Sequence, residues 1–197
     1  MSALPLGGDP VLALVVGALL VIPVAAARAA TMSGLVAGGA AAAWFVYAGG
    51  APALCAFGAL VVGGTAASRA GRARKEAFGA AEIRGGRRSA SNVLANAGPA
   101  AALLAVGALR SGAEEGSLAF LAAACGALAA STADTIAGEL GMLTNAVPRR
   151  LLFGRVARKG ENGAMSYPGT AFAIAAALVV GGLVAGCLAA AASRGPV

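Results

Sequence analysis

Long apolar segments separated by short polar stretches constrain this chain more than any other feature of its sequence. Six such segments can be drawn, at about 10–27, 31–48, 51–67, 93–109, 117–140 and 168–192. Most of them approach the roughly 20 residues that a helix needs to cross a bilayer, and the first three are at the short end. The chain is 12% charged, whereas about a quarter of a typical soluble domain is charged. The sequence therefore predicts an all-α, polytopic membrane helix bundle of about six transmembrane helices, in a single integral membrane domain over residues 1–197.

The basic residues are concentrated in alternate gaps between the apolar segments. The gap after the first segment contains Arg28, and the gaps after the third and fifth are basic loops at about 68–91 and 141–167. Together these gaps hold thirteen of the 15 Lys and Arg residues. Cytoplasmic loops of membrane proteins carry such an excess of cations. We therefore expect the N-terminus outside and the basic loops at the cytoplasmic face of a cell (inner) or thylakoid-type membrane, with no nucleic-acid partner.

Two carboxylates, Asp134 and Glu139, interrupt the fifth apolar segment. An ionisable residue within a membrane costs roughly 2.5–3.5 kcal/mol on insertion scales, and such residues mark functional sites. On an ideal helix Ser131, Asp134 and Thr135 share a face, whereas Glu139 lies about 140° away from Asp134. The two carboxylates therefore converge if the helix unwinds at one of the nearby glycines. The alternative is that Asp134 faces an internal helix contact and pairs with an arginine.

The loop before the fourth segment has the composition of an anion site. It reads RGGRRSASNVLAN over residues 84–96. Paired glycines let backbone amides approach an anion, and arginines donate charge-assisted, often bidentate hydrogen bonds to phosphate. A helix that begins here would add N-terminal amides as donors and would place Asn92 and Asn96 on one face. The alternative is a positive-inside anchor followed by two packing asparagines.

These groups are compatible with phosphoryl transfer. The chain contains no His, no P-loop motif and no cysteine spacing typical of zinc sites. Proteins hold phosphate-bridging Mg²⁺ with one or two carboxylates plus waters, and phosphoryl transfer requires mainly positioning, a metal and well-placed cations. We therefore expect Mg²⁺ held by Asp134 and Glu139, with Arg149 and Lys159 of the second basic loop as further catalytic residues.

Several short motifs resemble those of a known membrane family. They are GGRR at 85–88 with NVLAN at 92–96, ADT at 133–135 with GELG at 138–141, PR at 148–149, GENG at 160–163, and Ser166 with GT at 169–170. In this order, over about residues 28–181, they resemble the TMEM19-like integral membrane family, formerly a domain of unknown function. That family includes the phytyl-phosphate kinases of tocopherol biosynthesis.

The resemblance implies a kinase that phosphorylates an isoprenyl monophosphate, phytyl or geranylgeranyl, to the diphosphate. It implies a nucleoside triphosphate donor, with CTP expected, and Mg²⁺. Taken with the residue chemistry, it gives a set of substrate- and nucleotide-phosphate-binding candidates: Arg84, Arg87, Arg88, Ser89, Asn92, Asn96, Ser131, Thr135, Asn162, Gly163, Ser166 and Thr170.

Two other functions remain open. The first is a lipid-phosphate carrier or flippase, in which the basic mouth and the acidic pair form a translocation path. A carrier should need polar groups deeper in the bilayer, and the first three segments contain almost none. The second is another lipid-headgroup transferase.

Overall fold

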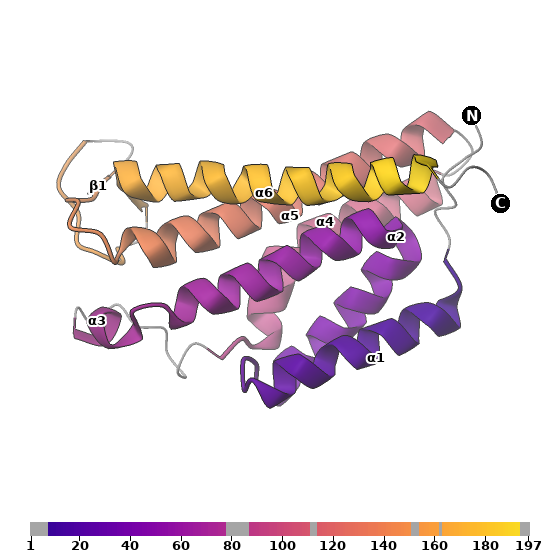
Figure 1. The fold of residues 1–197 in the computed structure, drawn as a ribbon, viewed down its shortest axis with the longest axis horizontal. Helices are drawn as coiled ribbons and strands as arrows, with labels where there is room; N and C mark the ends of the chain where they lie inside the picture. The colour runs from indigo at the N-terminus through magenta and orange to yellow at the C-terminus, as the bar shows by residue number, and fades with distance from the viewer. Residues whose placement is uncertain (1–7, 78–86, 111–113, 151–153, 162, 194–197) are drawn as a thin grey trace.

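The computed structural model describes residues 8–77, 87–110, 114–150, 154–161 and 163–193. Long helices lie side by side in one bundle, and a short β-hairpin projects from one end (Figure 1). The elements are α1 (Pro10–Ala26), α2 (Met32–Arg69), α3 (Arg72–Ala77), α4 (Ala90–Leu109), α5 (Glu114–Gly141), β1 (Arg149–Arg150), β2 (Ala164–Met165) and α6 (Tyr167–Ser193). The predicted all-α membrane bundle is confirmed, and the antiparallel pair β1–β2 is a small addition to it.

Polar residues at the helix starts explain where the first two helices begin. The Asp9 side chain accepts the Val11 N–H at 2.8 Å, and Pro10 occupies the first turn of α1. Thr31 accepts the Gly34 N–H through its hydroxyl at 3.2 Å. Such caps satisfy backbone donors that have no partner within the helix.

A bend at Gly50 divides α2 into two arms. Gly50 has φ 59° and ψ −154°, a conformation that glycine adopts at little cost because it has no Cβ. The chain turns back at this point, so that the arms 32–49 and 51–69 form a V (Figure 1). Each arm is about 27 Å long at 1.5 Å per residue, close to the thickness of a bilayer core. The second and third predicted segments are therefore the two arms of one bent helix.

Four helices are long and apolar enough to cross a membrane, namely α2, α4, α5 and α6, and α1 is a shorter apolar helix. This finding rests on the length and composition of the helices, and it covers the described residues. The predicted number of about six spans stays a prediction.

The packed centre of the bundle joins both arms of α2 to α4 and α5. The rings of Phe45 and Phe57, one from each arm, lie 5.0 Å apart between centroids. The Trp44 indole N–H donates to the Ala101 carbonyl on α4 at 3.1 Å, and Leu128 of α5 is fully buried in the same cluster. Much of the remaining core is alanine, which allows the helices to approach closely.

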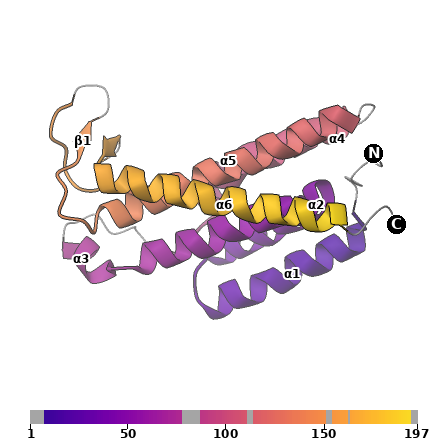
Figure 2. The same cartoon turned by 45° about the horizontal axis from the view of Figure 1, so that its top comes forward.

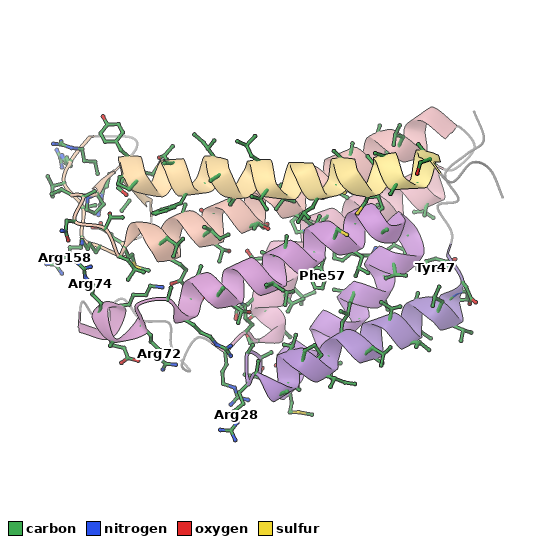
Figure 3. The ribbon with its side chains drawn as sticks, in the orientation of Figure 1. Arg28, Tyr47, Phe57, Arg72, Arg74 and Arg158 are labelled. Atoms are coloured by element: carbon green, nitrogen blue, oxygen red, sulfur yellow. The ribbon has the colours of Figure 1, made fainter. Side chains whose placement is uncertain are left out.

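The connections that carry most of the cations lie together at one end of the bundle. In Figure 3, Arg72, Arg74 and Arg158 are at this basic end, Arg28 lies at the turn between α1 and α2, and Tyr47 is at the opposite end. The start of α1 and the end of α6 also lie at the end opposite the basic one (Figure 2). The structure thus brings the predicted basic loops together, and their cytoplasmic location stays a prediction.

Two glycines in the first arm of α2 give a matched test of the packing. A Cβ at Gly34 would lie 2.1 Å from the Arg88 carbonyl oxygen, whereas a Cβ at Gly38 meets no atom within 4 Å. We expect Gly34→Ala to lower the free energy of unfolding by about 1–3 kcal/mol through overpacking. Gly38→Ala should be neutral or slightly stabilising, since alanine favours the helix. Thermal unfolding in detergent measures both, and equal midpoints would contradict the close approach at Gly34.

Candidate functional site

An apolar cavity of about 460 Å³ lies between α1, both arms of α2 and the start of α4. This volume is within the range of sites that hold one small ligand, about 300–1,000 Å³. Most of the lining is aliphatic or glycine. The described polar side chains that line the cavity come from the C-terminal half of α2 and from the start of α4 and the residues just before it: Thr65, Arg69, Arg88, Asn92 and Asn96.

Backbone pairing fixes Arg88 at the basic end of this cavity. The Arg88 N–H donates to the Ala29 carbonyl at 2.9 Å, and the Arg88 carbonyl accepts the Thr31 N–H at 2.9 Å. The neighbouring Arg87 guanidinium donates to the Ala30 carbonyl at 3.1 Å. The segment before α4 is therefore hydrogen-bonded to the α1–α2 connection. This pairing fixes the position of the Arg88 backbone, from which its side chain extends.

The Arg88 side chain reaches the contact between α2 and α5. Its Nη2 lies 3.4 Å from the Ser68 hydroxyl and 3.0 Å from the position that a Cβ on Gly64 would take. The Thr135 methyl lies 3.4 Å from that same position. The structure therefore brings Arg88 and Thr135, two of the predicted phosphate-binding candidates, close together.

Glu139 is a partner in a buried ion pair. Its Oε2 accepts from the Lys75 ammonium at 2.6 Å, and its Oε1 accepts from the Ser68 hydroxyl at 2.8 Å. Lys75 also donates to the Ala67 carbonyl at 2.7 Å. The two side chains are 2% (Lys75) and 10% (Glu139) exposed. Both carboxylate oxygens of Glu139 are thus engaged with neighbouring side chains.

The expected convergence of Asp134 and Glu139 is wrong. Helix α5 continues through Gly138 to Gly141 without unwinding, so the two carboxylates stay on different sides of it. Asp134 is exposed and forms no hydrogen bond or ion pair with the part of the chain that the structure describes. In this structure Glu139 is engaged in an ion pair, and its expected role as a metal ligand and catalytic residue stays a prediction. The arginine partner considered for Asp134 is likewise not found among the described residues.

The predicted polar residues of α4 hold the start of that helix. Asn92 Oδ1 accepts from the Ser89 N–H at 3.1 Å and from the Ser89 hydroxyl at 2.7 Å. Asn96 Nδ2 donates to the Asn92 carbonyl at 2.8 Å, and the Asn96 carbonyl accepts from Ser131 of α5 at 2.8 Å. Asn92 and Asn96 therefore line the cavity and also join α4 to its surroundings.

The two cationic catalytic candidates lie in the connector between α5 and α6. Arg149 Nη1 donates to the Gly154 carbonyl at 2.9 Å, and Lys159 Nζ donates to the Thr144 carbonyl. Neither residue lines the cavity. In this structure they stabilise the connector at the basic end of the bundle.

The candidates near the start of α6 have local partners as well. Ser166 accepts the Gly169 N–H at 3.2 Å through its hydroxyl, and the Thr170 hydroxyl donates to the Ser166 carbonyl at 3.2 Å. Gly163 is an exposed turn residue with φ 75°. The remaining candidates, Arg84 and Asn162, lie outside the described residues.

Lys75 is the functional-site neighbour that sequence reasoning missed. It lies in a run of cations that reads as a positive-inside anchor, and nothing in that run distinguishes it from the arginines around it. The available signal was Glu139 itself, since a buried carboxylate requires a partner. The sequence does not show which of many cations supplies it.

The ion pair predicts a strong dependence between two substitutions. Glu139→Gln or Lys75→Met alone should lower the free energy of unfolding by about 3–5 kcal/mol, because each leaves the other group buried without its partner. The double variant should be more stable than the sum of the single effects predicts. Chemical or thermal unfolding in detergent measures this, and strictly additive losses would contradict the pairing.

Glu161 of the connector predicts a pH dependence. The hydrogen bond from the Arg158 N–H, and then the Arg150 guanidinium, lower the pKa of Glu161 from its ordinary value. Because its folded pKa is lowered, the carboxylate stabilises the connector above the ordinary glutamate pKa of about 4.3, and this contribution is lost as the pH falls through the lowered value. An NMR titration of labelled Glu161 should show the lowered pKa, and Arg150→Gln should raise it. An unchanged titration in that variant would contradict the contact.

Comparison with known proteins places the chain in a family. No curated protein and no solved structure matches it. The sequence matches the family described as integral membrane protein DUF92 over residues 15–195, which agrees with the resemblance carried by its motifs. The chain therefore belongs to the DUF92 family of integral membrane proteins.

Proposed function

We propose that this protein is a membrane-embedded kinase that phosphorylates an isoprenyl monophosphate to the diphosphate. The donor is a nucleoside triphosphate, with CTP expected, and the cofactor is Mg²⁺. The observation that carries the proposal is the apolar cavity, whose charged lining residues in the described part of the chain are Arg69 and Arg88. An apolar space that ends in guanidinium groups is complementary to a lipid with an anionic head.

The acceptor is bound by the two ends of this cavity in different ways. Its isoprenyl tail packs against the aliphatic and glycine lining, where burial of apolar surface is favourable. Its phosphate meets Arg88, whose planar guanidinium suits bidentate binding of phosphate. Asn92 and Asn96, which line the same region, help to orient the phosphate. The acceptor is already an anion, so the reaction requires no strong general base.

The donor is attracted by the cations of both basic loops. Arg74 of α3 donates to Asn145, in the connector after α5, at 2.8 Å, which joins the two loops at one end of the bundle. Dense positive charge raises the local concentration of a triphosphate and lowers the cost of its negative charge. We assign Arg149 and Lys159 to this donor region, together with the connector residues Gly163, Ser166 and Thr170.

The residues present fit Mg²⁺ through one carboxylate. Asp134 is exposed next to Thr135 on α5, whereas Glu139 is committed to its ion pair. Sites that hold Mg²⁺ against phosphates commonly use one or two carboxylates and several waters. When bound, the ion would neutralise charge on the phosphates. Asp134 is therefore the residue assigned to hold it.

The lining of the cavity favours a kinase over a carrier. A translocation path for a phosphate head requires polar groups along its length, and the described polar lining residues come from one region of the cavity wall. A different lipid-headgroup transferase would use the same acceptor site with another donor. A panel of donors in a phosphoryl-transfer assay distinguishes these functions.

The first experiment is a phosphoryl-transfer assay on purified protein in detergent. It combines Mg²⁺, a panel of labelled nucleoside triphosphates, and phytyl or geranylgeranyl monophosphate. We expect Mg²⁺-dependent prenyl diphosphate that disappears in Asp134→Asn. Arg88→Gln should lower kcat/KM by about 10- to 100-fold, since hydrogen bonds to charged groups contribute about 1.5–3 kcal/mol. Arg28→Gln is the matched control, because Arg28 is an arginine at the turn between α1 and α2 that does not line the cavity.

Three outcomes would contradict the proposal. No product with any donor, together with saturable prenyl-phosphate binding, would indicate a carrier. Equal losses in Arg88→Gln and Arg28→Gln would show that Arg88 has no specific role. Full activity of Asp134→Asn would remove the metal assignment.

A further inference from the structure

Two glycines in the wall of the cavity leave open space where a side chain would stand. Gly38 of the first arm of α2 and Gly58 of the second arm both line the cavity, and a Cβ at either position meets no atom within 4 Å. Two other lining glycines differ. A Cβ at Gly34 would lie 2.1 Å from a backbone oxygen, and one at Gly39 would lie 2.8 Å from the Val21 side chain. Helix packing thus explains Gly34 and Gly39, whereas Gly38 and Gly58 serve no packing contact.

The cavity communicates with the apolar outer surface of the bundle. Leu20 of α1 and Val62 of the second arm of α2 line it, and they are 40% and 70% exposed. In a membrane that surface faces lipid, so a hydrocarbon tail can enter between these two helices without crossing water.

We infer that this cavity binds the tail of one phosphate lipid and that Gly38 and Gly58 determine how long a tail it accepts. The inference rests on the proposed function for the position of the phosphate head at Arg88. When the phosphate head is bound at Arg88, the lipid tail fills the open space next to Gly38 and Gly58. Gly38 and Gly58 come from different arms of the V. A larger side chain at either position therefore narrows the cavity, each from a different side.

Leucine substitutions convert this inference into a length measurement. A leucine at position 38 or 58 adds four carbon atoms to the cavity wall, and the first of them has room at each position. Each methylene of the tail that loses its buried position should weaken binding by about fourfold. Gly38 is four residues from Gly34, and Gly58 is six residues from Gly64, and both Gly34 and Gly64 lie next to Arg88, so the two positions are about 6 and 9 Å along α2 from it. A long tail therefore loses several such positions, whereas the five-carbon tail of dimethylallyl monophosphate ends at or before the obstruction.

The experiment measures equilibrium binding of labelled dimethylallyl and geranylgeranyl monophosphate to the full-length protein in detergent, without nucleotide. It compares Gly38→Leu, Gly58→Leu and the control Gly126→Leu. Gly126 lies on α5, where a Cβ also meets nothing within 4 Å, but it does not line the cavity. We expect the preference for the longer lipid to fall by at least about 10-fold in the two cavity variants and to stay unchanged in the control.

Each result bears on the inference. Unchanged length preference in both cavity variants, or the same change in Gly126→Leu, overturns it, and so does an equal loss of affinity for both lipids. If a leucine variant does not fold, Gly38→Ala and Gly58→Ala replace it, with an expected change in the preference of about fourfold.

The assay also distinguishes this inference from the proposed reaction. Length-selective binding without phosphoryl transfer from any donor supports the lipid site and contradicts the kinase. Phosphoryl transfer with an unaltered length preference supports the kinase and contradicts the role of the two glycines.

Discussion

The buried pair between Lys75 and Glu139 is the interaction on which the arrangement of the basic end depends. It joins α3 to α5, and through Ser68 it reaches α2 and the Arg88 guanidinium. An isolated charge in an apolar environment is strongly unfavourable. The Lys75 ammonium and the Glu139 carboxylate therefore stay in contact with each other. The pair therefore fixes the surroundings of Arg88, although neither of its members lines the cavity.

The bend of α2 provides the other half of the site. Gly50 lets one apolar helix return along the bundle, and the V between its arms is closed by α1 and the start of α4. The resulting space is apolar along most of its wall and cationic at one end, as a phosphate lipid requires. The same backbone pairing that ties Arg88 to Ala29 and Thr31 joins the arginine block to this space. The same backbone contacts thus stabilise the fold and position the candidate site.

Some contacts of the candidate residues follow from the local sequence, and others do not. Arg88, Asn92 and Asn96 line the cavity, and Thr135 lies beside Arg88, because helical spacing and the order of motifs are local properties. The ion pair of Glu139 does not follow from the local sequence. The position of Glu139 on α5 was predictable from the helical repeat, but its partner Lys75 is 64 residues away along the chain. Nothing in the local sequence specifies such a contact.

By itself the sequence determined that this is a helical membrane protein with its cations in alternate connections. A spanning helix satisfies its own backbone hydrogen bonds. The length, hydropathy and flanking charges of each segment therefore suffice to identify it as a membrane helix. Only the tertiary structure decided that α2 folds back on itself, that Glu139 pairs with Lys75, and that a cavity opens between α1, α2 and α4. Each of these depends on which distant side chains meet when the helices pack, and packing between helices follows shape and paired charge rather than hydropathy.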